Sequence, residues 1–156
     1  NPDLLILAWL PVLIMMVVML AGVLIIWQRK DKSENRELSV TNPFQIKMAL
    51  QFGLFLAVIM LLAEAAKTWL GDTGIYLVAM ISGIADVDAI TLSLASMAKN
   101  DLAAETAVRG IVIAAIVNTL FKTGLAVFIA GRQIFWPLLP VAMAACGAGG
   151  LSLLWI

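Results

Sequence analysis

The sequence feature that most restricts the possible folds of this chain is an apolar run near its start that contains no charged residue. It extends from Leu4 to Trp27. A helix needs about 20 mostly apolar residues to cross the hydrocarbon core of a bilayer. The run therefore predicts a membrane-spanning helix, with Pro11 expected to kink it. It is too long for a cleaved signal peptide and lacks the basic front end of one.

Composition supports a membrane protein over a soluble one. Hydrophobic residues make up 63% of the sequence and charged residues 13%. Ordinary soluble domains are about half apolar and roughly a quarter charged. Lys and Arg equal Asp and Glu in number, so no net positive charge favours a nucleic acid partner. One cysteine and no histidine exclude a disulfide framework, a zinc finger and a Ser-His-Asp site, and no enzyme activity is expected.

Four further apolar segments follow the first one. The sequence predicts a single all-α domain over residues 1–156, a polytopic helix bundle with about five spans, at residues 4–27, 46–70, 74–98, 106–131 and 134–156. Four spans plus a re-entrant segment is the alternative. The tryptophans lie near the predicted span ends, as expected for an interfacial aromatic belt; they are Trp9, Trp27, Trp69, Trp136 and Trp155.

Lys and Arg set the expected orientation. The loop over residues 28–47 holds five of them, and Lys99 lies in the loop after the third span. Because basic loops stay in the cytoplasm, both loops are predicted to be cytoplasmic. With five spans, this places the N-terminus outside and the C-terminus inside. A Glu64–Lys67 pair near the end of the second span is interpreted as interfacial.

Two carboxylates interrupt the third span near its middle. Asp86 and Asp88 would each cost at least about 2.5–3.5 kcal/mol at membrane depth. On a regular helix, residues two apart point to nearly opposite sides. Either the helix is unwound near Asp86 and Asp88, which Gly83 would permit, or the two aspartates face different helices or subunits.

Oxygen ligands of this kind suit hard cations. Asp86 and Asp88, with the Thr91 hydroxyl nearby in sequence, match the ligand preference of Mg²⁺, Ca²⁺ or Mn²⁺. Asp86 and Asp88 are therefore the predicted metal ligands, and a bound divalent cation such as Mg²⁺ is the one cofactor considered. A proton site fits the same two aspartates. In the structural interpretation, the carboxylates are protonated or paired within the bundle.

The fourth span offers partners for these aspartates. Asn118 and Lys122 are four residues apart and share one helix face. An ionised Lys122 at membrane depth needs a counter-charge, which Asp86 or Asp88 would supply. Protonation of that carboxylate would break the pair and couple a proton to a conformational change. A static ion pair between the two spans is the alternative.

Several segments together resemble a known family. They are Asn42-Pro43-Phe44, Trp69-Leu70-Gly71-Asp72, the stretch from Gly83 to Thr91, and Asn118-Thr119-Leu120-Phe121-Lys122. They are similar to an uncharacterised bacterial membrane domain that forms the C-terminal half of many MgtC/SapB-like membrane proteins. The resemblance extends from about Leu4 to the end of the chain. It implies a helical inner-membrane domain of a longer protein whose MgtC-like N-terminal half is absent here, with Asp86, Asp88, Asn118 and Lys122 as its signature polar positions.

Two hypotheses for function follow. The first is a bacterial inner-membrane transport domain for an inorganic cation, a hard divalent ion or a proton-coupled one. Magnesium limitation, with which MgtC-like proteins are associated, modestly favours a divalent ion. Five spans are few for a permeation path, so a homodimer is expected. The second is a regulatory or assembly module that packs against an MgtC-like domain or another membrane protein, through the small residues 144–150. A polar environment around Asp86 and Asp88 would favour transport, and a dry, fully paired network would favour assembly.

Overall fold

The fold is entirely helical in the part of the chain that the computed structural model describes, residues 2–29, 46–130 and 132–155. The elements are α1 (Pro2–Arg29), α2 (Ile46–Leu70), α3 (Asp72–Ala85), α4 (Val87–Met97), α5 (Ala104–Ala130), α6 (Arg132–Ser152) and a short 3-10 turn at Leu153–Trp155. Four helices are long and apolar enough to cross a membrane, over Leu7–Ile26, Leu50–Leu70, Ala104–Phe128 and Phe135–Ser152. The predicted all-α polytopic fold is confirmed.

The third expected span, residues 74–98, differs from a single crossing helix. It is divided into α3, of 14 residues, and α4, of 11 residues. At 1.5 Å per residue these helices are about 21 Å and 17 Å long, well short of a core of about 30 Å. The break lies at Asp86, whose backbone is extended (φ −159°, ψ 136°). The expected unwinding near Asp86 and Asp88 is therefore confirmed.

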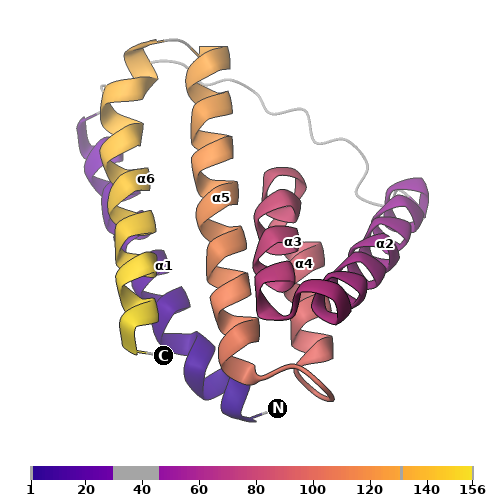
Figure 1. The fold of residues 1–156 in the computed structure, drawn as a ribbon. Helices are drawn as coiled ribbons and strands as arrows, with labels where there is room; N and C mark the ends of the chain where they lie inside the picture. Colours follow the sequence, from indigo (N-terminus) through magenta and orange to yellow (C-terminus); the bar gives the residue numbers. More distant parts are fainter. Residues whose placement is uncertain (1, 30–45, 131, 156) are drawn as a thin grey trace.

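The chain reverses direction at this break. A Cβ placed on Gly110 of α5 would lie 3.5 Å from Ile75 near the start of α3 and 2.7 Å from Leu94 near the end of α4. In one straight helix, Ile75 and Leu94 would be about 28 Å apart. Helices α3 and α4 therefore form a hairpin that enters and leaves the bundle at the same end (Figure 1). This matches the alternative of four spans plus a re-entrant segment.

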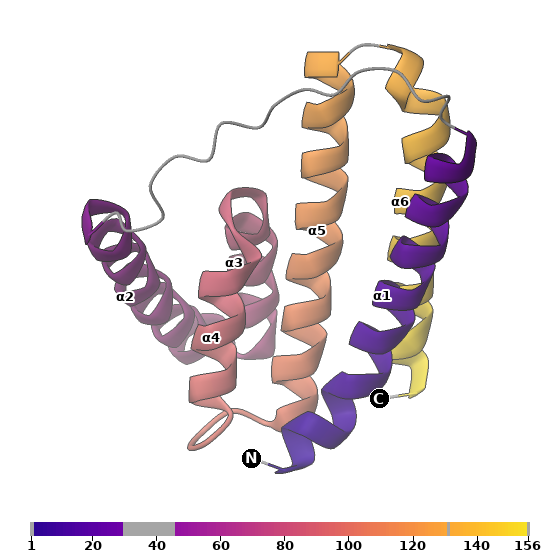
Figure 2. The same ribbon diagram turned by 180° about the vertical axis from the view of Figure 1, so that it is seen from behind.

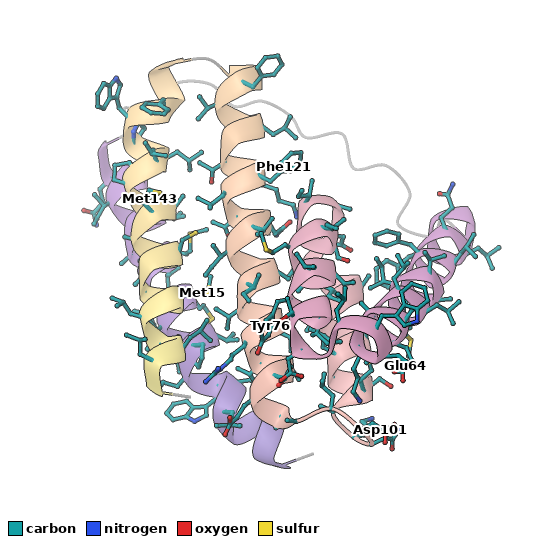
Figure 3. The ribbon with its side chains drawn as sticks, in the orientation of Figure 1. Met15, Glu64, Tyr76, Asp101, Phe121 and Met143 are labelled. Carbon is teal, nitrogen blue, oxygen red and sulfur yellow. The ribbon has the colours of Figure 1, made fainter. Side chains whose placement is uncertain are left out.

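The base of the hairpin joins four helix ends. Lys67 at the end of α2 donates a hydrogen bond from Nζ to the backbone oxygen of Asp101, at 2.6 Å. Thr106 at the start of α5 donates from Oγ1 to Oδ2 of Asp72, at 3.1 Å. Figure 3 shows Glu64 and Asp101 at this end of the bundle. Lys67 thus bonds to the loop after α4, and no ion pair with Glu64 is formed between these two described residues.

Helix α5 lies in the centre of the bundle, between two groups of helices. The hairpin packs on one side of it, with α2 packed on the hairpin, and α1 and α6 pack on the other side (Figure 2). Small residues allow the closest approaches. A Cβ on Gly83 would lie 2.6 Å from the backbone oxygen of Ala114, and one on Gly149 of α6 would lie 2.6 Å from Met15 Sδ. Met15 is visible between α1 and α6 in Figure 3. The hairpin is therefore held rigidly against α5.

The number of helices that cross the membrane determines whether the two ends of the chain lie on the same side or on opposite sides. The expected arrangement, with the N-terminus outside and the C-terminus cytoplasmic, requires an odd number. Four crossing helices and one hairpin instead return the chain to the side on which it starts. In both ribbon views, the first and last described residues lie at the end of the bundle where the hairpin has its base.

Cysteine labelling distinguishes the two arrangements. Thr73 and Asn100 are exposed at the two ends of the hairpin. Thr73→Cys and Asn100→Cys, each in a Cys146→Ala background, are expected to react with an impermeant thiol reagent from the same side of intact cells. A Ser33→Cys control, placed before the crossing helix α2, should show the opposite accessibility. Labelling of positions 73 and 100 from opposite sides would establish a continuous third span.

Candidate functional site

Asp86 shapes the tip of the hairpin. Its Oδ1 accepts a hydrogen bond from the backbone N–H of Asp88, at 3.3 Å, so Asp86 is the N-cap of α4. Asp is among the preferred N-cap residues because its carboxylate satisfies a free N–H of the first helical turn. The Asp86 side chain is half-buried and that of Asp88 is exposed. The sequence pattern thus places a carboxylate where one helix ends and the next begins.

The tip lies near the middle of α5. Gly83, one turn before the break, contacts Ala114, and α5 extends from Ala104 to Ala130. Asp86 is about 4.5 Å farther along the hairpin, and Asn118 is about 6 Å farther along α5. Asp86 and Asn118 are therefore at similar heights, well inside the helix that crosses the bilayer, where charged groups are costly.

Two buried oxygen atoms near the tip have no hydrogen-bond partner. They are Oγ of Ser82, a residue that is 2% exposed, and Oδ1 of Asn118. Helical side chains lean toward the helix N-terminus, so the Asn118 side chain leans back toward the Gly83 contact. Buried polar atoms are hydrogen-bonded in the great majority of proteins. Two such atoms, on the segments of α3 and α5 that meet at the Gly83–Ala114 contact, indicate a site for a polar ligand.

Two other hydroxyl side chains nearby, unlike that of Ser82, form hydrogen bonds within their own helices. Ser93 of α4 donates to the backbone oxygen of Ala89, and Thr119 of α5 donates to that of Ala115, each at 2.8 Å. These bonds within a helix are ordinary for hydroxyl side chains. Ser82 makes no such bond, although the carbonyl one turn before it is in the same helix. The sequence analysis did not include Ser82 among the site residues. Its position one turn before Asp86 was the sequence feature that could have suggested it.

The end of α3 adds negative potential to the tip. The last carbonyls of a helix have no partner within that helix, and they carry the negative end of the helix dipole. The Asp86 N–H bonds to the Ser82 oxygen at 2.8 Å, but the carbonyls of residues 83–85 follow without a further helical turn. The N-terminus of α4 begins at the same tip and carries the positive end of a helix dipole, so the net negative charge of the tip comes from the Asp86 carboxylate.

The remaining predicted site residues lie around this tip without converging on it. Thr91 is half-buried in α4, and Lys122 is exposed on α5, about 12 Å beyond Ala114 along the axis. Among the described residues, no ion pair joins Lys122 to Asp86 or Asp88. No group of three or more His, Cys, Asp and Glu residues in the described ranges could hold a metal ion. A metal site at Asp86 and Asp88 would therefore need neutral oxygen ligands as well.

An apolar groove of about 500 Å³ lies elsewhere, between α1 and α6. Its lining includes Leu10, Ile14 and Leu151. The one polar side chain among the described residues of this lining, Ser152, donates its hydroxyl to the backbone oxygen of Gly149, at 2.6 Å. The groove is therefore a weaker candidate for an ion site than the hairpin tip.

Comparisons with known proteins agree with a membrane domain whose activity is not assigned. Residues 1–130 match the family model described as "Domain of unknown function (DUF4010)". The chain is 38% identical over 106 residues to an uncharacterized protein of Aquifex aeolicus (strain VF5), a match that covers 67% of the chain and 46% of that relative. The chain thus spans about half the length of this relative. No solved structure matches it.

Proposed function

The chain belongs to the DUF4010 family of domains of unknown function, and from the hairpin we propose that it is a transport domain for an inorganic cation in the bacterial inner membrane. The family match agrees with the resemblance to an uncharacterised membrane domain. The family match does not include a link to MgtC/SapB-like proteins; that link is part of our proposal. Asp86 is the proposed central ligand, with Asn118, Thr91, Asp88 and Lys122 in its surroundings.

The observation that carries the proposal is the re-entrant hairpin with a carboxylate at its tip. Broken backbone at membrane depth is tolerated where it is buried in protein or lines a water-filled cavity. In many secondary transporters, interrupted helices supply carbonyls and helix ends that bind the ion near the bilayer midplane. The unpartnered oxygens of Ser82 and Asn118 differ from the dry, fully paired network that an assembly role would predict.

The proposed orientation follows from the four crossings. Helix α1 ends, and helices α2 and α6 begin, at the end of the bundle opposite the base of the hairpin (Figure 1). The basic residues at 28–47 lie between α1 and α2 in the sequence, and Arg132 is the first residue of α6. The positive-inside rule then places that end in the cytoplasm. The hairpin enters from outside, and an ion at its tip has crossed about half of the membrane. Both ends of the described chain then lie outside. The loop with Lys99 also lies outside, so the proposal reverses the cytoplasmic positions that the sequence predicted for this loop and for the C-terminus.

The cytoplasmic half of α5 supports a further partner in the membrane. Beyond the hairpin tip, α5 exposes Phe121, Lys122, Leu125 and Phe128, and Figure 3 shows Phe121 there. An ammonium exposed to lipid at this depth is costly. A second copy of the chain, in a C2 dimer, is the proposed cover. The alternative is assembly with an MgtC-like domain or another membrane protein.

Ion flux into liposomes tests the transport proposal. The full-length protein, reconstituted in vesicles, is expected to carry a cation, and Asp86→Asn together with Asp88→Asn is expected to remove that flux. Na⁺, Mg²⁺ and H⁺ are followed separately with ion-sensitive dyes. Equal flux through the wild-type and doubly substituted proteins would remove the aspartates from the mechanism. No flux above that of empty vesicles would favour the assembly role.

A further inference from the structure

We infer that the hairpin tip binds one small monovalent cation of the size of Na⁺, with Ser82 Oγ, Asn118 Oδ1 and the Asp86 carboxylate as side-chain ligands. This inference rests on the proposed function and narrows its substrate class. It departs from the hard divalent ion that the aspartate pair alone predicted. It also adds Ser82, which the sequence pattern did not single out as a ligand.

The two unpartnered oxygens provide the first step of the argument. Ser82 Oγ and Asn118 Oδ1 are both buried and both lack a hydrogen bond. Leaving a buried acceptor unpaired costs its full desolvation penalty. A bound cation would give both oxygens a partner at once, because each has lone pairs available. A structural role in packing would be served by alanine at position 82 without this penalty.

Convergence of the ligands is the second step. Gly83 follows Ser82 directly and contacts Ala114, one turn before Asn118. The close approach at Gly83, which a larger residue would prevent, brings the end of α3 against this part of α5. Asp86 closes the tip one turn after Ser82. The three ligands therefore come from two helices and one helix break, within about 8 Å of one another along the bundle axis.

Charge is the third step. Asp86 is half-buried, whereas Asp88 is exposed. Only the Asp86 carboxylate is therefore expected to bind the cation together with Ser82 Oγ and Asn118 Oδ1. A single negative charge neutralises a monovalent cation and leaves a divalent cation with an uncompensated charge in a medium of low dielectric constant. Lys122, farther along the same face of α5, adds positive charge and disfavours a divalent ion further.

Hydration is the fourth step. Mg²⁺ gives up its water reluctantly and usually keeps several water ligands. Ser82 is 2% exposed, so its hydroxyl offers no open space for such a hydrated ion. Hydroxyl, amide and carboxylate oxygens are hard ligands, and the absence of His removes the ligand that borderline metals most often use. A dehydrated monovalent cation therefore suits the single carboxylate and the burial of Ser82 better than a hydrated Mg²⁺ does.

Ion-dependent thermal stability measures the binding directly. The full-length protein in detergent is melted in NaCl, LiCl, KCl or MgCl₂, with choline chloride keeping the ionic strength constant. A ligand that binds the folded state raises Tm as its concentration exceeds Kd. Na⁺ is expected to raise Tm in a saturable way and more than K⁺ or Mg²⁺. Ser82→Ala is expected to weaken the apparent Na⁺ affinity roughly tenfold to hundredfold, the range seen when the support of a metal site is lost.

Ser93→Ala is the matched control. Ser93 is also buried in the hairpin, but its hydroxyl bonds to Ala89 of its own helix. Its Na⁺ affinity should equal that of the wild type. Asn118→Asp provides a second variant of the same size, which adds a carboxylate to the site. It is expected to shift the preference from Na⁺ toward divalent cations, whatever its effect on basal stability.

The outcomes separate this inference from the proposed function. Equal Na⁺ affinity in Ser82→Ala and Ser93→Ala would overturn the inference. Stabilisation of the wild type by Mg²⁺ and not by Na⁺, or by a change of pH alone, would also overturn it while cation transport stands. If no cation changes Tm and no flux appears in liposomes, the proposed function falls together with the inference.

Discussion

Replacing Gly83 with alanine is expected to lower the Tm of the protein by roughly 5–10 °C. The new Cβ would lie 2.6 Å from the backbone oxygen of Ala114 and 3.0 Å from its Cα. Both atoms are backbone, so α5 or the hairpin must shift as a whole. Overpacking of this kind costs about 1–3 kcal/mol, and each kcal/mol lowers Tm by about 2–4 °C at this chain length. The measurement is thermal unfolding of the purified protein in detergent.

Two other glycines provide matched controls. Gly53 in α2 and Gly124 in α5 have no atom within 4 Å of an added Cβ. Alanine has a higher helix propensity than glycine by about 1 kcal/mol, so Gly53→Ala and Gly124→Ala should leave Tm unchanged or slightly raised. If Gly83→Ala unfolds at the same temperature as these two variants, the hairpin does not pack on α5 at this contact.

Hydropathy was sufficient to predict the class of the fold but not the path of residues 74–98. The segment has the length and composition of a span, and its reversal depends on contacts with distant residues. Gly83 and Gly110 allow the two arms to lie against α5, and Asp86 caps the second arm. A hydropathy window sees none of these contacts. The break itself was predictable because two aspartates in an apolar helix face opposite sides.

Most residues of the candidate site, but not Ser82, could be predicted from the sequence. Asp86, Asp88, Asn118 and Lys122 stand out because polar residues are rare in apolar spans, and the structure places the first three near the hairpin tip. Serine is common in such helices because its hydroxyl can bond to the preceding turn. Ser93 does so and Ser82 does not. This difference depends on local side-chain geometry; in the sequence, only its position one turn before Asp86 sets Ser82 apart from Ser93.

The second large effect is expected at Asp86, where a set of substitutions separates its charge from its capping role. Asn and Ser are as good at the N-cap as Asp, whereas Ala costs about 1 kcal/mol. In choline chloride without Na⁺, Asp86→Asn and Asp86→Ser should therefore keep the wild-type Tm, and Asp86→Ala should unfold a few degrees lower. Only the carboxylate can neutralise a bound cation, so all three variants are expected to lose cation flux.

The size of that loss follows from the cost of an unpaired charge. Removing one partner of a buried charge pair costs about 3–5 kcal/mol, which corresponds to a loss of roughly a hundredfold or more. Asp88→Asn is the matched control, because the Asp88 side chain is exposed, and its flux is expected to fall severalfold at most. Flux and Tm are measured on the same preparations. If flux follows Tm, with Asp86→Asn and Asp86→Ser as active as the wild type, then Asp86 acts only as a helix cap. If all three variants lose flux while only Asp86→Ala loses stability, then the charge of Asp86 serves the ion, because the cap is intact in the other two.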